Sequence, residues 1–162
     1  MDFRDLRVGI GYDVHRLQPD RPLILGGVHI PQSLGLLGHS DADVLVHALM
    51  DAMLGALSLG DIGRHFPPED EAFRGISSLV LLQRVKELAF EKGYRLHNAD
   101  CTVIAQLPKI SPFFPEMREK LAGTLGVPVE AVSVKATTTE GLGLTGRQEG
   151  IACQAIASMI SE

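Results

Sequence analysis

Cysteine is scarce in this chain. The 162 residues include two cysteines, Cys101 and Cys153, and each lies in an apolar run. A chain of this length buries most of its apolar surface without disulfide bonds. Its hydrophobic content, 45%, is ordinary for a globular protein. We therefore expect a single domain, residues 1–162, in which both thiols are reduced and buried.

Excess positive charge and long apolar runs are also lacking. The formal net charge of −5 argues against nucleic acid or an anionic membrane as a partner, because both favour a basic face. A local basic pocket for a small anionic substrate stays compatible with that charge. No uninterrupted apolar stretch is long enough to cross a bilayer, and Met1–Arg7 has no apolar core typical of a signal peptide. We expect a cytoplasmic protein, unless a short targeting segment has been removed.

Internal repeats, linkers and low-complexity segments are absent, and strand-like and helix-like patterns alternate instead. The strands are expected at Leu6–His15, Tyr94–Gln106, Val132–Thr138 and Gly150–Ile160, with a hairpin in Pro22–Ile30. The helices are expected at Ser40–Leu57, at Ser77–Lys92 and from Pro115 to about Leu125. The connections Pro31–His39, Gly60–Gly75 and Glu140–Gln148 are expected to be loops. This order predicts a single-domain α/β fold, with a mixed β-sheet packed against α-helices.

Common nucleotide-binding and hydrolase motifs are missing as well. Neither a Walker-type glycine loop nor a nucleophile-elbow serine motif occurs. Gly141–Gly146 matches the G-x-G-x-x-G pattern. That pattern binds a dinucleotide only when a helix follows it, with an acidic residue about 20 positions further on. The remaining residues leave no room for such a unit, so we expect no dinucleotide site.

The ionisable residues of interest gather in two places. Asp13 and His15 alternate on a strand and project from one face, about 6 to 7 Å apart. Such a pair alone is usually a surface feature. Asp43, His47 and Asp51 recur every four residues on an otherwise apolar helix, so they lie on one face. A lone histidine there would usually be a satisfied core residue, but three ionisable groups are costly to bury unless they are paired or bind a metal.

Two histidines and one carboxylate, Asp13, His15 and His47, form a set that suits zinc. Three protein ligands leave a fourth position open for a substrate oxygen, whereas structural zinc sites usually have four ligands and favour thiolates. Either Asp43 or Asp51 is expected to support the imidazoles by hydrogen bonds. The sequence therefore predicts a catalytic site for zinc or another divalent metal.

A second candidate site follows the strand that ends near Thr138, where the sequence reads T-T-T-E-G from Thr137 to Gly141. Hydroxyl and backbone N–H groups at a strand end can hold phosphate oxygens, and Glu140 can hold a hard cation such as magnesium. Threonine also favours edge strands in the absence of any ligand. The residues alone leave both interpretations open.

With these motifs assembled, the sequence resembles the 2-C-methyl-D-erythritol 2,4-cyclodiphosphate synthases, a family of the non-mevalonate isoprenoid pathway. The resemblance covers nearly the whole chain, and its motifs are Gly11–His15, Leu37–Asp43, Leu59–Gly63, Ala105–Lys109, Val134–Glu140 and Thr145–Cys153. It implies an α/β homotrimer with active sites between subunits. It also implies a metal-dependent lyase whose substrate is 4-diphosphocytidyl-2-C-methyl-D-erythritol 2-phosphate. The 2-phosphate attacks the β-phosphorus, CMP leaves and the cyclodiphosphate forms.

The resemblance also implies roles for single residues. The zinc ligands are Asp13, His15 and His47, and Glu140 holds magnesium or manganese at the diphosphate. The implied catalytic residues are His39, Thr138 and Glu140. The implied substrate contacts are His39 and Ser40 in a phosphate-side loop, Asp61 and Gly63 at the methylerythritol hydroxyls, and Ala105, Lys109, Ala136, Thr137 and Thr138 around the cytidine diphosphate. Arg147 is a further candidate, because three copies at a trimer axis would suit a small anion or an isoprenoid diphosphate.

The chain departs from the family pattern at three positions. Gln154 stands where an acidic residue is expected, Gly141 stands where a lysine is common, and the residue that follows Lys109 is Ile110. Two other functions remain open on the residues alone. A zinc hydrolase would use the same metal ligands to activate water, with Asp51 as its general base. A metal-binding or scaffold trimer without catalysis would have no use for a phosphate site.

Overall fold

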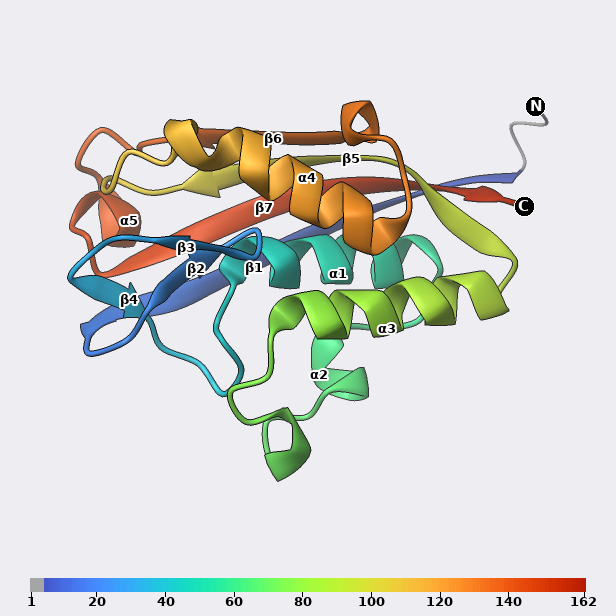
Figure 1. The fold of residues 1–162 in the computed structure, drawn as a ribbon, viewed down its shortest axis with the longest axis horizontal. Helices are drawn as coiled ribbons and strands as arrows, with labels where there is room; N and C mark the ends of the chain where they lie inside the picture. Colours follow the sequence, from blue (N-terminus) through green and yellow to red (C-terminus); the bar gives the residue numbers. More distant parts are fainter. Residues whose placement is uncertain (1–4) are drawn as a thin grey trace.

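In residues 5–162, the part of the chain that this computed structural model describes, five strands form one mixed sheet (Figure 1). Part of the Met1–Arg7 segment thus lies outside the described residues. The strands in sheet order are β4 (Leu34–Leu36), β1 (Leu6–Pro19), β7 (Gly150–Ser161), β5 (Tyr94–Ile104) and β6 (Val132–Thr137). β5 and β6 run parallel, and the other neighbours are antiparallel. β2 (Leu23–Leu25) and β3 (Val28–Ile30) form a separate hairpin.

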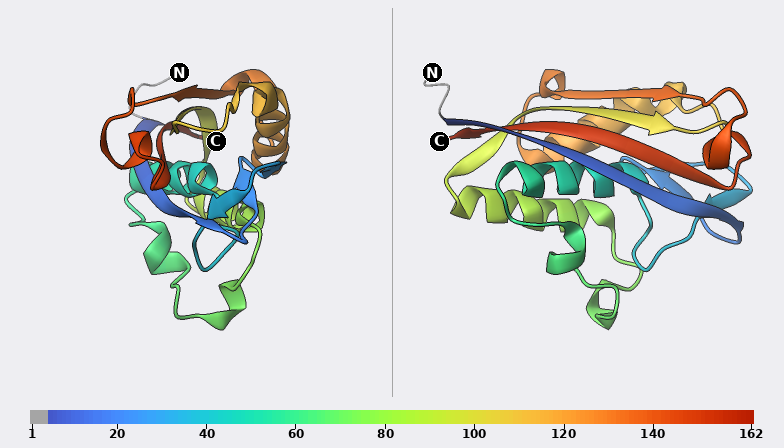
Figure 2. Two further views of the ribbon diagram at one scale, coloured as in Figure 1. Left: turned by 90° about the vertical axis from the view of Figure 1, so that its left-hand side faces the viewer. Right: turned by 180° about the vertical axis from the view of Figure 1, so that it is seen from behind.

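The longer helices gather on one side of the sheet, which curls around α1 (Figures 1 and 2). These helices are α1 (Val44–Ala56), α3 (Ser78–Glu91) and α4 (Phe114–Leu125). α1 packs between the sheet and α3, and α4 contacts β6. The predicted single-domain α/β fold with a mixed sheet is confirmed. Within the described residues, no helix is long and apolar enough to span a membrane.

The core follows the sequence-based expectation closely. α1 is buried along almost all of its length, and the last segment is a strand. Cys101 and Cys153 are free and buried, as predicted. Burial raises the pKa of the Cys101 thiol to about 12, so this side chain stays an unreactive thiol at neutral pH.

The predicted start of the buried helix was wrong. The helix begins at Val44 rather than Ser40, because Ala42 has a left-handed φ of 59° and the extended Asp43 is the N-cap. The Asp43 carboxylate accepts a hydrogen bond from the Val46 N–H at 3.1 Å. The Ser40 hydroxyl instead accepts one from the Ala42 N–H, inside the loop.

Three segments predicted as loops also contain short elements. They are β4 in Pro31–His39, α2 (Ile62–His65) in Gly60–Gly75, and α5 (Gly143–Gly146) in Glu140–Gln148. Each spans one turn or three residues, which is too short for a periodic pattern in the sequence. α5 leads directly into β7, which runs antiparallel to β1 and β5, rather than into a second parallel strand.

The backbones of β1 and α1 pack directly against each other. A Cβ atom added at Gly9 would lie 2.0 Å from the carbonyl oxygen of Ala52, and one added at Gly11 would lie 1.9 Å from that of Ala48. Both glycines are on the strand face that carries the odd-numbered residues. The absence of side chains at these two positions therefore lets the helix lie directly on the strand.

The opposite face of β1 is apolar and exposed. Val8, Ile10 and Tyr12 keep 63%, 61% and 56% of their surface accessible, and Ile156 on the neighbouring β7 keeps 47%. Figure 2 shows β1 and β7 from behind, on the side that the helices leave uncovered. An exposed apolar patch of this kind indicates a surface that another molecule covers.

The close approach predicts a large effect for a very small side chain. Gly9→Ala should lower the free energy of unfolding by about 3 kcal/mol or more, because its methyl group would overlap the backbone of α1. The matched control is Gly123→Ala in α4, where nothing lies within 4 Å of the added Cβ. The control should gain about 0.5–1 kcal/mol from its higher helix propensity. Chemical denaturation measures both, and equal stability of Gly9→Ala and the wild type would contradict this packing.

Candidate functional site

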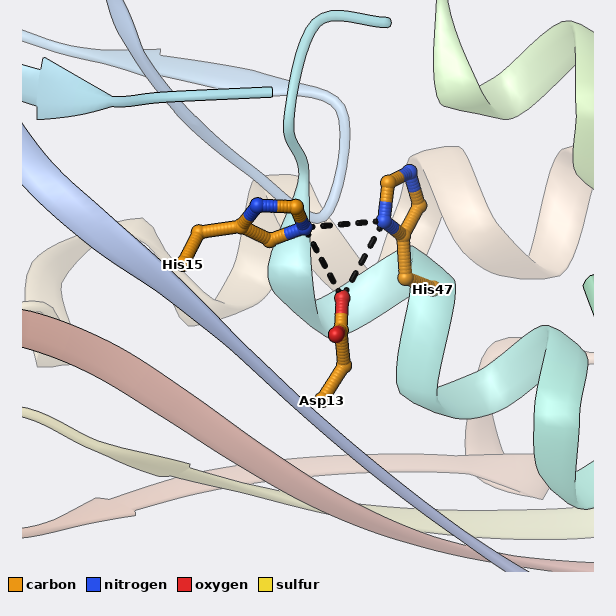
Figure 3. Close-up of side chains that lie close together, drawn as sticks. All are labelled: Asp13, His15 and His47. Atoms are coloured by element: carbon orange, nitrogen blue, oxygen red, sulfur yellow. Dashed lines mark hydrogen bonds and ion pairs between the residues drawn. The ribbon is translucent and has the colours of Figure 1, made fainter. Parts of the chain in front are cut away.

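Three side chains converge where β1 meets the first half of α1 (Figure 3). Asp13 and His15 come from β1, and His47 comes from α1. Asp13 Oδ2 lies 2.9 Å from His15 Nε2 and 3.1 Å from His47 Nδ1. The two ring nitrogens are themselves 3.1 Å apart. The three residues that the sequence predicted as metal ligands therefore form one group of facing donor atoms.

The spacing of these donor atoms fits a single divalent cation. Tetrahedral zinc with bonds of about 2.0–2.1 Å separates its ligand atoms by about 3.3 Å, close to the distances found here. His15 Nδ1 donates a hydrogen bond to the Leu37 carbonyl at 2.8 Å, which leaves the Nε2 lone pair facing Asp13. One carboxylate and two imidazoles are also a donor set that zinc prefers. The residues present thus fit a zinc-type centre.

The electrostatics of the group favour the charged forms of Asp13 and His15. Burial alone would raise the pKa of Asp13, but the hydrogen bonds and charges of His15 and His47 hold that pKa well below its usual range. Burial alone would lower the pKa of His15, yet the Asp13 carboxylate outweighs it and the pKa is raised. A cation that binds this group must therefore compete with a proton for His15 Nε2.

The expected support of the imidazoles by Asp43 or Asp51 was wrong. Besides capping α1 through the Val46 N–H, Asp43 accepts backbone hydrogen bonds from Gly26 and Gly27. Burial raises the pKa of Asp43 to about 6, although the three N–H donors lower that pKa. Asp51 accepts the Ile62 N–H at 2.8 Å and so anchors the start of α2. Both carboxylates are used by backbone groups, which the sequence pattern could not distinguish from imidazole partners.

His47 Nε2 instead faces two serine hydroxyls, Ser40 Oγ at 3.2 Å and Ser78 Oγ at 3.0 Å. Sequence reasoning missed Ser78, although a serine at the N-terminus of a predicted helix was a visible signal. It also missed Arg21, whose guanidinium donates to the carbonyls of Leu36, Gly38 and Ser40. These hydrogen bonds hold the loop that leads into α1.

A cavity of about 210 Å³ opens beside the three candidate ligands. Its walls bring together several residues implied by the family resemblance, namely Asp13, His15, His39, Ser40, His47 and Gly63, with an apolar side formed by Phe66 and Phe73. His39 Nε2 lies 3.0 Å from the Asp70 carbonyl. Asp61 caps α2 by accepting the Arg64 N–H, next to this wall. The positions that the resemblance implies for the 2-phosphate and for the methylerythritol thus flank the three candidate ligands.

A second cavity, of about 330 Å³, lies at the ends of β5 and β6. All five residues implied for the cytidine diphosphate line it: Ala105, Lys109, Ala136, Thr137 and Thr138. Glu140 follows, with a left-handed φ of 54° and its carboxylate 3.4 Å from the Thr138 hydroxyl. Arg147 is paired with Glu149, so an anion there would compete with this carboxylate. Among the described residues, the two cavities have no lining residue in common.

Comparison with known proteins points to one family. The profile of the YgbB family matches residues 6–160 of the chain. A curated 2-C-methyl-D-erythritol 2,4-cyclodiphosphate synthase from Desulfitobacterium hafniense is 61% identical over 155 residues, which cover 96% of this chain and 98% of that protein. A protein of the same name from Agathobacter rectalis is 60% identical over 154 residues, which cover 95% of this chain and 87% of that protein.

Solved structures agree with this similarity. IspF from Plasmodium falciparum, solved as a CDP complex, is 35% identical with a TM-score of 0.85, and the match covers 97% of each chain. The bifunctional IspDF from Campylobacter jejuni is 43% identical with a TM-score of 0.94. That match covers 97% of this chain but 42% of the longer protein, so the chain corresponds to less than half of it.

The raised pKa of His15 predicts how metal binding depends on pH. A cation needs the Nε2 lone pair, so below the His15 pKa binding must expel a proton. The apparent zinc affinity should therefore fall by about tenfold per pH unit below this pKa and level off above it. Competition with a chromophoric chelator between about pH 5.5 and 8.5 measures this dependence. The exposed His29→Gln is the matched control and should keep the wild-type profile; an affinity that stays constant over the range would contradict the prediction.

Proposed function

The chain belongs to the YgbB family, and we propose that it catalyses the reaction after which its curated relatives are named. It would convert 4-diphosphocytidyl-2-C-methyl-D-erythritol 2-phosphate to 2-C-methyl-D-erythritol 2,4-cyclodiphosphate, with release of CMP, as a step of the non-mevalonate isoprenoid pathway. The observation that carries this proposal is the Asp13, His15 and His47 group beside a cavity lined by His39 and Ser40, in a chain that matches the family over nearly its full length.

The chemistry requires positioning more than proton transfer. An oxygen of the 2-phosphate attacks the β-phosphorus, and the new P–O bond closes the ring. The bond from the β-phosphorus to the bridging oxygen breaks, and its electron pair leaves on CMP. The attacking group is already anionic, so no general base is needed, and ring closure within one molecule gains much from correct orientation. His39 and Ser40, held by the anchored loop, are suited to orienting the 2-phosphate.

Two cations would lower the cost of bringing phosphate charges together. Zinc or another divalent ion at Asp13, His15 and His47 would supply charge neutralisation at a phosphate oxygen. Glu140 is the proposed ligand for magnesium or manganese at the diphosphate. Lys109 and the backbone and hydroxyl groups of Thr137 and Thr138 would bind the cytidine diphosphate from the second cavity.

We further propose that the active chain is a homotrimer with each site shared by two subunits. The substrate must reach both the metal group and the cytidine cavity, yet one chain lines these as two separate cavities. The exposed apolar face made by Val8, Ile10, Tyr12 and Ile156 is a suitable subunit interface. A heterologous threefold contact would place the metal half of one subunit beside the cytidine half of its neighbour.

The hydrolase alternative is less well supported. Its only general base suggested by the sequence is Asp51, whose carboxylate is occupied by the Ile62 N–H and which is not among the described residues lining the metal cavity. A general base has to lie within hydrogen-bond reach of the water that it activates. The scaffold alternative leaves the polar lining of two cavities unexplained.

Product analysis tests the proposed reaction. The purified chain, with zinc and magnesium, should release CMP and the cyclic diphosphate in equal amounts, without solvent oxygen in either product. His47→Ala should lower the rate by at least about 10³-fold and lose bound zinc, while the chain stays folded. Incorporation of one labelled solvent oxygen per turnover would instead establish a hydrolase, and full zinc occupancy in His47→Ala would contradict the assigned ligand.

Mixed assembly tests the shared site. His47→Ala damages the metal half, and Lys109→Glu places like charge beside the diphosphate in the cytidine half. Each variant alone should be nearly inactive. After unfolding and refolding together in equal amounts, about a quarter of the interfaces should join two intact halves, and activity should return to about that fraction. Mixed trimers that form but stay inactive would refute a site shared in this way.

A further inference from the structure

A histidine binds a metal through one ring nitrogen, and the partner of the other nitrogen decides whether the metal-facing atom carries a lone pair or a proton. For His15 that partner is the Leu37 carbonyl, which can only accept. For His47 the partners are the hydroxyls of Ser40 and Ser78, and a hydroxyl can donate or accept. The contacts of these hydroxyls therefore determine which tautomer His47 adopts.

The Ser78 hydroxyl is already committed as a donor. It donates its single proton to Asp41 Oδ1, so toward His47 it can only accept. His47 Nε2 then carries a proton and donates it to Ser78 Oγ, which leaves Nδ1, the ring nitrogen that faces Asp13 and His15, as the atom that can bind a cation. A hydroxyl that donated to Nε2 would place the proton on Nδ1 and block the metal position.

The Ser40 hydroxyl does not determine the tautomer of His47. It accepts the Ala42 N–H, and its own proton can turn toward His47 Nε2 or away from it. Ser40 is thus compatible with either tautomer. Asp41 is held firmly, because its second oxygen accepts the Ser78 N–H at 2.9 Å and its own N–H donates to the Ile76 carbonyl. Ser78 is fully buried, so water does not compete for its proton.

We propose that Asp41 and Ser78 are positioning residues that fix His47 in its metal-binding tautomer and thereby set the affinity of the metal site. This inference rests on the metal site of the proposed function. It assigns a role to the first turn of α3 and to the loop before α1, neither of which contributes a metal ligand. The Asp41 charge, transmitted through the Ser78 hydroxyl, also makes the facing Nδ1 a stronger electron-pair donor.

The test compares zinc affinity in four chains. Ser78→Ala removes the hydroxyl, and Asp41→Asn keeps the shape of the side chain but can donate to Ser78 and reverse the hydrogen bond. Both should weaken zinc binding by about 10- to 100-fold, as measured by competition with a chelator. The double variant should bind zinc no more weakly than the single variant with the lower affinity, because Asp41 acts on His47 through Ser78. The matched control is Ser77→Ala, a neighbouring serine whose side chain makes no capping hydrogen bond, and its affinity should stay within about threefold of wild type.

The tautomer itself supplies a readout that a merely structural role would not move. Ring ¹⁵N shifts of His47 in the metal-free chain should report a protonated Nε2 in the wild type and in Ser77→Ala, and a partly or fully unprotonated Nε2 in Ser78→Ala and Asp41→Asn. Unchanged ring shifts and unchanged affinity in both variants would overturn the proposal. If Ser78→Ala does not fold, Asp41→Asn alone decides between these outcomes. A folded wild-type chain that binds no zinc would instead overturn the metal site itself.

Discussion

Contact between the backbones of β1 and α1 is the constraint on which the rest of the structure depends. Gly9 and Gly11 have no side chains, so the helix lies against the strand with no layer of side chains between them. Two and four residues beyond Gly11 on the same strand face, Asp13 and His15 then reach His47 within 3.1 Å. The same contact that builds the core therefore sets the dimensions of the candidate metal site, and a wider helix–strand spacing would separate its donor atoms.

The loop that enters α1 serves as the scaffold of the site. The Leu37 carbonyl orients one imidazole, the hydroxyl of Ser40 contacts the other, and Asp41 reaches the same imidazole through a neighbouring serine. Asp43 meanwhile caps the helix, and Arg21 holds the loop by three carbonyl groups. Because the polar groups of this short segment are paired, the cost of burying charge near the candidate metal site is offset locally.

The two faces of β1 have different surroundings. One face is buried against α1 and carries the candidate ligands, while the other exposes Val8, Ile10 and Tyr12. The chain has a complete core, but the residues suited to the metal and to the cytidine diphosphate lie around separate cavities. An exposed apolar face together with a divided site is what a shared-subunit arrangement would require, so folding and assembly would each complete a different part of the enzyme.

The amino-acid sequence by itself determined the α/β order, the buried helix and the pairing of Asp13 with His15, because strand and helix periodicities are set by neighbouring residues. It also marked His47 as unusual in an apolar helix. Only the tertiary structure decided that the glycine face of β1, rather than its apolar face, meets α1, and that Ser78 rather than Asp43 supports the imidazole. Those outcomes depend on how elements distant in sequence pack together, and local spacing carries no information about the partner that a side chain meets across such a contact.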